Sequence, residues 1–196
     1  HLLSRRQRQM CIRDSGYSGG KDSSMLVSLV VDMVMRLPEN KRTKKIFIVT
    51  SDTGVENPIV KRYMHLSSAK INEFSSKYNA NIKADIIYPD IAQSFWSLVI
   101  GLGYPTPEPP GFRWCTERLK ILPMNRYTNR IIDQYGEVVL LLGVRKAESL
   151  TRKRSISARE IEGKLLVPHS DISKAYIYNP LTLSLIHISE PTRRSY

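Results

Sequence analysis

Residues 16–23 read GYSGGKDS and decide the expected fold class, because a helix that is apolar on nearly every side follows them. Met, Leu and Val fill most positions of residues 23–36, which predicts a helix buried against a sheet. The adjacent glycines let the backbone turn tightly and direct N–H groups at one point, and the helix N-terminus adds partial positive charge. The residues expected to bind an anion here are Ser18, Gly19, Gly20, Lys21, Asp22 and Ser23.

Strands and helices alternate along the rest of the chain. The predicted strands are residues 45–51, 81–88 and 137–142; the predicted helices are 58–78, 91–100 and 115–135, the last in two pieces around Pro123; residues 101–111 form a Pro- and Gly-rich loop. This alternation predicts an α/β fold, a mostly parallel sheet with helices on both faces. Because ligands of such folds bind at the carboxyl ends of strands, the loops there are the expected site.

The helix predicted over residues 58–78 carries an apolar stripe at helical spacing. We expect this stripe to face the sheet and to form one layer of the core. Its members are Ile59, Tyr63, Leu66, Ala69, Ile71 and Phe74.

A polar loop, Asp52-Thr53-Gly54, follows the strand at residues 45–51. The carboxylate of Asp52 could bind a ribose hydroxyl or a metal-bound water, and Gly54 would let a ligand approach closely. Taken alone, the pattern is more typical of a strand-to-helix turn with Asn57 as the helix cap.

A basic segment, LGVRKAES at residues 142–149, follows the last predicted strand. Gly143 allows close approach of a ligand, and Arg145 and Arg152 can bind phosphate oxygens through their guanidinium groups. The alternative interpretation is a solvated, charged helix start.

Cys115 lies at a predicted helix start within the sequence RWCTERLKI. Three cations, Arg113, Arg118 and Lys120, stand close to it in the chain, and positive charge favours the nucleophilic thiolate form of a cysteine. A lone cysteine is more often a small buried apolar residue, but this one follows an irregular loop and enters a basic segment.

These motifs together resemble one protein family. SGGKDS resembles the PP-loop of the ATP pyrophosphatase superfamily; it is not a Walker A loop, which requires a glycine where Ser15 stands. DTG-x-E-x-P and LGVRKAES-x-x-R resemble the second and third motifs of the phosphoadenylylsulfate reductase-like branch. RWCTERLKI-x-P, with WSLVIGLGYP before it, resembles the DNA phosphorothioation sulfurtransferase group known as DndC.

The resemblance implies an enzyme that binds ATP and Mg²⁺, adenylates an acceptor with release of pyrophosphate, and acts with a cysteine desulfurase and other phosphorothioation proteins on DNA. It implies catalytic roles for Lys21, Cys115 and Arg145, and nucleotide contacts from the loop residues above, with Asp52, Thr53, Gly54, Gly143, Arg145 and Arg152. Cys115 would carry a persulfide or ligate a cluster, since longer family members hold a 4Fe–4S cluster. The basic residues expected to contact nucleic acid are Arg113, Arg118, Lys120, Lys153 and Arg154.

Three alternatives remain open at this stage. A phosphoadenylylsulfate or adenylylsulfate reductase would share the fold without cleaving ATP. A tRNA thiolation enzyme would satisfy the positive charge equally well. From another class, a basic nucleic-acid-binding module would use the cluster around Arg152 without catalysis.

The two ends of the chain differ from its middle. Residues 1–15 and 183–196 lack a sustained pattern and are expected to be non-native, which leaves residues 16–182 as an incomplete PP-loop domain. The family places its first strand just before the loop, where this chain has at best a stub at residues 10–12.

Composition narrows the class of partner. The chain has 196 residues and a formal charge of +12, which favours an anionic partner such as a nucleotide or nucleic acid. Its longest apolar run is about half of what a bilayer requires, so we expect no membrane span. Its two cysteines cannot form a disulfide scaffold, which favours a reducing, cytoplasmic setting.

Overall fold

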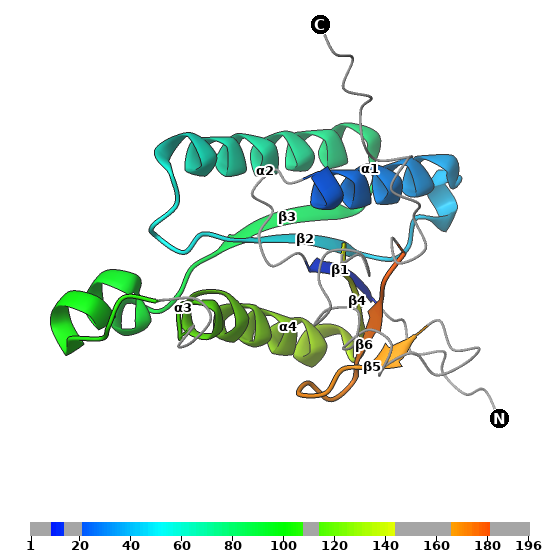
Figure 1. The fold of residues 1–196 in the computed structure, drawn as a ribbon. Coiled ribbons are helices and arrows are strands. Elements are labelled where there is room, and N and C mark those ends of the chain that lie inside the picture. The colour runs from blue at the N-terminus through cyan, green and yellow to red at the C-terminus, as the bar shows by residue number, and fades with distance from the viewer. Residues whose placement is uncertain (1–8, 14–20, 108–113, 144–165, 181–196) are drawn as a thin grey trace, which may run out of the picture.

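The structure, a computed structural model, describes residues 9–13, 21–107, 114–143 and 166–180 (Figure 1). Its centre is a sheet of six strands in the order β3-β2-β1-β4-β6-β5, parallel except for the antiparallel pair β5/β6. The strands are β1 Gln9–Arg13, β2 Ile46–Ser51, β3 Ile82–Ile87, β4 Val138–Leu141, β5 Val167–Pro168 and β6 Ala175–Tyr178. The predicted α/β class with a mostly parallel sheet is confirmed.

Helices cover both faces of this sheet. Helices α1 (Lys21–Arg36) and α2 (Pro58–Tyr78) lie on one face, and α4 (Leu122–Tyr135) lies on the other (Figure 1). Shorter helical elements are η1 Glu39–Lys41, η2 Ile91–Gln93, η3 Ser97–Gly101, α3 Trp114–Thr116 and η4 Glu117–Ile121. The helix predicted over residues 91–100 is divided into η2 and η3. The helix predicted over 115–135 is one helical stretch made of α3, η4 and α4, and Pro123 lies in the first turn of α4. Among the described residues, no helix is both long and apolar enough to cross a bilayer.

Strand β2 is buried along its whole length because it packs against both helical layers. Ile46 and Ile48 join the core beneath α1, whereas Phe47 and Val49 join the core beneath α4. A strand buried on both faces reads as a continuous apolar run, which is why the sequence identified it. Helix α1 is buried on one side only, because it forms an outer layer and exposes Leu29 and Met33 to solvent.

Strand β1 occupies the centre of the sheet, paired with β2 on one side and β4 on the other. The expectation of at best a stub at residues 10–12 was too short, since the strand covers Gln9–Arg13. Residues from the first fifteen therefore complete the parallel core. The expectation that residues 1–15 and 183–196 are non-native concerns their origin and stays a prediction.

The predicted core stripe of α2 was confirmed only in its second half, where Ile71 and Phe74 pack against the core beneath α1. Ile59 is 78% exposed, and Tyr63 and Leu66 are also exposed, whereas the buried positions include Ser68 and Ser75. The inner side is polar because it binds the backbone of the edge strand β3. The N–H of Ile82 donates to Ser75 Oγ at 2.8 Å, and Asn72 bonds both the N–H of Ala84 (2.8 Å) and its carbonyl (3.0 Å). Helix α2 thereby supplies partners for backbone groups of Ile82 and Ala84 that the edge strand β3 would otherwise leave unpaired.

Replacing Asn72 with alanine should lower the free energy of unfolding by about 2 kcal/mol, because it leaves a donor and an acceptor of Ala84 unpaired. The measurement is urea unfolding followed by circular dichroism. Asn79→Gly is the matched control, because Asn79 ends the same helix in the left-handed region, where glycine is tolerated. Equal stability of N72A and the parent would contradict the edge-capping role.

Candidate functional site

The strands that precede the sequence motifs end at one edge of the sheet. Strands β2, β1 and β4 are parallel neighbours, so their carboxyl ends lie along the same edge. Strand order reverses at β1, with β2 and β3 on one side and β4, β6 and β5 on the other. Such a reversal point is where open α/β sheets bind ligands. The motif at residues 16–23 follows β1, Asp52 follows β2 and Gly143 follows β4.

Gly143 brings the third motif against the first. A Cβ at Gly143 would stand 3.4 Å from the carbonyl oxygen of Asp22 and 3.7 Å from the backbone nitrogen of Ser23. Both residues belong to the first turn of α1, which begins at Lys21. Ser23 is buried and Asp22 is half-buried at this contact. The segment after β4 therefore passes directly beside the helix N-terminus that the first motif was expected to supply.

Asp52 supplies a buried carboxylate at the end of β2, with its side chain fully shielded from solvent. Its Oδ1 accepts the N–H of Gly54 at 2.9 Å, and its Oδ2 lies 3.4 Å from Nζ of Lys61. Oδ2 accepts no hydrogen bond within the described part of the chain. A buried carboxylate is costly unless it is paired, so Lys61 holds this one at the carboxyl edge.

The loop after Asp52 is built as a tight turn into α2. Gly54 has a φ of +79°, which favours glycine, and nothing lies within 4 Å of the position that its Cβ would take. The hydroxyl of Thr53 donates to Glu56 Oε1 at 3.0 Å. Asn57 caps α2 by accepting the N–H of Ile59 at 2.9 Å, so the predicted cap is confirmed. The turn and the buried carboxylate therefore occur together, and the two interpretations of this motif are compatible.

The cysteine segment is joined to the same edge through β2. The hydroxyl of Ser51, the last residue of β2, donates to the carbonyl of Leu119 at 3.1 Å, and both residues are buried. Cys115 lies one turn earlier in the same helical stretch, half-buried and with a free thiol. The thiol is therefore carried on an element fixed to the residue that precedes Asp52.

An aromatic cluster anchors that element. The buried ring of Trp114 stacks on Phe95 with centroids 5.7 Å apart and meets Tyr104 edge-on, while its Nε1–H donates to the carbonyl of Pro105 at 2.9 Å. Arg118 donates to Gln93 and to the hydroxyl of Tyr104, and its guanidinium lies over the Tyr104 ring. Arg118 thus stabilises the aromatic cluster, and its contact with nucleic acid stays a prediction.

The other predicted site residues divide into two groups. Lys120 is half-buried on η4, and Lys21 is the first residue of α1. Outside the described residues lie Ser18, Gly19, Gly20, Arg113, Arg145, Arg152, Lys153 and Arg154.

Sequence reasoning missed two residues of this edge, Lys61 and Ser51. Lys61 comes one turn into α2, so its position four residues after the cap Asn57 could have indicated that it reaches back over the loop. Ser51 was treated only as the end of a strand. No pattern in the chain pairs it with Leu119, which is far away in the sequence.

The resemblance implies two inorganic groups, and the residues fit only one of them. Mg²⁺ is commonly held by one or two carboxylates together with substrate phosphates, and Oδ2 of Asp52 is a suitable oxygen. In the described segments no three His, Cys, Asp or Glu residues gather as a metal site, so most ligands would come from the nucleotide. A 4Fe–4S cluster does not fit this chain, because it requires four thiolates and the chain has two cysteines.

Comparison with solved structures shows a likeness in fold. No protein-family model and no curated protein matches the sequence. The crystal structure of phosphoadenylyl-sulfate (PAPS) reductase from Candida auris, in a phosphate complex, is similar with a TM-score of 0.45 and 13% identity, covering 92% of this chain and 67% of that chain. A likeness of this size carries no argument about site or activity. The class that the described residues define is an α/β protein with a mostly parallel sheet and polar loops at its carboxyl edge.

Proposed function

We propose that this chain is an ATP-dependent sulfurtransferase that adenylates an acceptor, a DNA backbone phosphate, and directs sulfur to it in DNA phosphorothioation. The proposal joins the sequence motifs to one observation, the close approach of Gly143 to the first turn of α1. Gly143 lies beside Asp22 and Ser23, which supports a site between the start of α1 and the segment after β4 at the reversal point of the sheet. The helix N-terminus and Lys21 on one side, with Arg145 following Gly143 in the chain, would suit a polyphosphate ligand.

The first chemical step is adenylation. The triphosphate of ATP would lie on residues 18–23, with the N–H groups at the start of α1 and the ammonium of Lys21 against its oxygens. An acceptor oxygen of DNA attacks the α-phosphorus, and the bond to the bridging oxygen breaks to release pyrophosphate. Lys21, Arg145 and Arg152 would stabilise the charge that develops on the phosphoryl oxygens. Magnesium, when bound, would neutralise the phosphates near Asp52.

The second step transfers sulfur. A persulfide on Cys115, supplied by a partner cysteine desulfurase, attacks the adenylated phosphorus through its terminal sulfur and displaces AMP. A second thiol then cleaves the remaining sulfur–sulfur bond, which leaves sulfur on the DNA phosphate and a disulfide on the thiols. The half-buried position of Cys115, on an element fixed to Ser51, keeps the thiol accessible near the carboxyl edge.

The test of this proposal is exchange of labelled pyrophosphate into ATP in the presence of DNA, with Gly143 varied in two sizes. The chain should catalyse exchange, and Gly143→Ala should retain most of it, because its Cβ makes only ordinary contact with Asp22. Gly143→Val adds two methyl groups beyond that Cβ and should lower exchange by about 100-fold, because it forces the loop away from α1.

Circular dichroism checks that both variants are folded. Equal exchange by the valine variant would refute the role of this contact. A chain that binds phosphoadenylylsulfate and catalyses no exchange would instead be a reductase. DNA binding that is independent of nucleotide, again without exchange, would indicate a binding module.

A further inference from the structure

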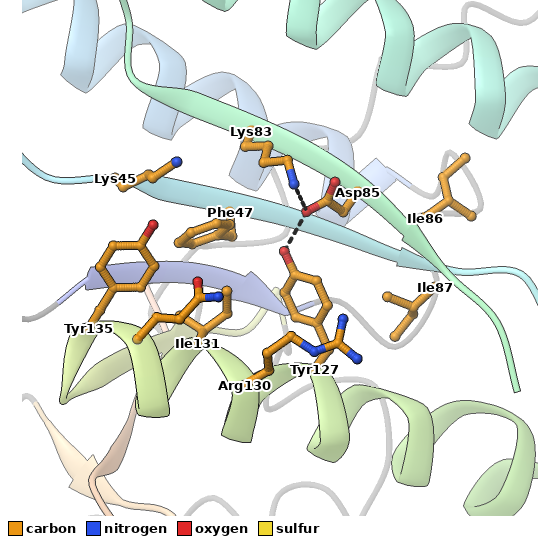
Figure 2. Close-up of a pocket in the computed structure, with 11 residues that line it drawn as sticks. Lys45, Phe47, Lys83, Asp85, Ile86, Ile87, Tyr127, Arg130, Ile131 and Tyr135 are labelled. Carbon is orange, nitrogen blue, oxygen red and sulfur yellow. Dashed lines mark hydrogen bonds and ion pairs between the residues drawn. The ribbon is translucent and has the colours of Figure 1, made fainter. Parts of the chain in front are cut away.

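A cavity lies between the edge strand β3 and helix α4, on the face of the sheet that α4 covers (Figure 2). Its volume is about 470 Å³, and its lining extends from Lys45 and Phe47 at the start of β2 to Ile87 at the carboxyl end of β3. Asp52, by contrast, follows the other end of β2. The proposed adenylation chemistry makes no use of this cavity, which we call the β3–α4 groove.

Positive charge predominates in the groove lining. Lys45, Lys83 and Arg130 line it together with a single carboxylate, Asp85. Asp85 is engaged within the groove, because its Oδ2 accepts the hydroxyl of Tyr127 at 2.6 Å and lies 3.0 Å from Nζ of Lys83 (Figure 2). The lining therefore carries more positive than negative charge, and its one carboxylate already has Tyr127 and Lys83 as partners. This charge favours an anionic ligand.

Aromatic rings form the other part of the wall. Phe47 is buried and meets Tyr127 nearly edge-on at 6.3 Å and Tyr135 at a tilt at 5.7 Å. Nζ of Lys45 lies 5.8 Å from the Phe47 centroid, so a cation borders the same aromatic surface. Figure 2 shows Tyr127 and Tyr135 rising from α4 toward β2 and β3, with Arg130 beside Tyr127. The rings are held by one another and by Asp85, so this wall is formed before any ligand binds.

We propose that the β3–α4 groove binds a small aromatic ligand that bears a phosphate group, of the size of a nucleoside monophosphate. The volume lies in the range of small-molecule sites. The rings of Tyr127 and Tyr135 offer faces and edges for a planar base, and the guanidinium of Arg130 can form two parallel bonds to a phosphate. A metal cation is disfavoured by three cationic side chains, and a wholly apolar ligand would make no use of the Arg130 guanidinium.

The test measures binding of AMP, adenosine and inorganic phosphate by titration calorimetry, using the chain with Lys21→Ala so that the proposed ATP loop is impaired. AMP should bind at least about tenfold more tightly than adenosine or phosphate, because only AMP uses both the rings and the cations. Arg130→Glu should weaken AMP by about tenfold or more, while Arg62→Glu, on the exposed surface of α2, should leave it unchanged.

Three results would overturn the proposal. They are equal affinity for AMP and adenosine, equal affinity in the parent and the Arg130→Glu variant, and AMP binding that disappears with Lys21→Ala alone. A single-stranded oligonucleotide is tested as a competitor of AMP for the groove in the same titration. If the oligonucleotide binds there with higher affinity than AMP, the groove is a nucleic-acid contact and the small-ligand assignment is wrong. Because the readout is binding at a different site, these results are independent of pyrophosphate exchange.

Discussion

Replacing Lys21 with alanine should lower ATP–pyrophosphate exchange by about 10²- to 10³-fold, the loss typical when one hydrogen-bond donor to a transition state is removed. Lys21 is the first residue of α1, directly after the predicted phosphate loop and in the turn that Gly143 contacts. At this position its charge and the helix N-terminus act on the same phosphate oxygens. Alanine is a good helix former, so the loss should not come from unfolding of α1.

The matched control for this variant is Lys70→Ala. Lys70 is exposed on α2, so this substitution removes the same charge from the chain and leaves the carboxyl edge unchanged. Exchange rates measured over a range of ATP concentrations should fall only in the Lys21 variant, while thermal unfolding midpoints stay similar in both. Full exchange by the Lys21 variant would show that residues 18–23 are not the phosphate loop and would contradict the proposed adenylation.

The parts of the fold that the sequence predicted well are those with local signals. Helix α2 runs from Pro58 to Tyr78 as predicted, because Asn57 caps its start and Asn79 ends it in the left-handed region with a φ of 47°. Strand β2 was identified because burial on both faces leaves no polar position in its middle. Both signals are contained in the segment itself.

The parts that were missed depend on neighbours far along the chain. The inner positions of α2 carry Asn72 and Ser75 because β3 is an edge strand, and no pattern within residues 58–78 reveals that. Strands β5 and β6 are short, and β5 has two residues, so they are defined by pairing rather than by periodicity. The β3–α4 groove combines Lys45 and Arg130 from distant segments for the same reason.

The candidate site shows the same division. The motifs after β1, β2 and β4 could be placed at one edge from strand order alone, since parallel strands end together. The pairing of Asp52 with Lys61 and of Ser51 with Leu119 could not, because each joins side chains whose distance depends on how a helix packs. Topology is thus readable from motifs, whereas the partners that hold a functional group in place are set by packing.

Replacing Cys115 with serine should abolish sulfur incorporation into DNA and leave ATP–pyrophosphate exchange nearly unchanged, if the thiol carries sulfur as proposed. The substitution is a small one at a half-buried position, so the stacking of Trp114 on Phe95 and the bond from Ser51 to Leu119 should persist. Serine lacks the polarisable sulfur that forms a persulfide, and this loss is chemical rather than structural.

Mass spectrometry of nuclease-digested DNA measures the incorporation, with a cysteine desulfurase, cysteine and a thiol reductant supplied. Thr116→Ser is the control, because Thr116 is the exposed neighbour of Cys115 and bears no thiol. Incorporation that survives in the Cys115 variant would make this thiol structural and would move sulfur delivery to the partner desulfurase. Loss of both incorporation and exchange would instead mean that the segment supports nucleotide activation through its attachment to β2, beside Asp52.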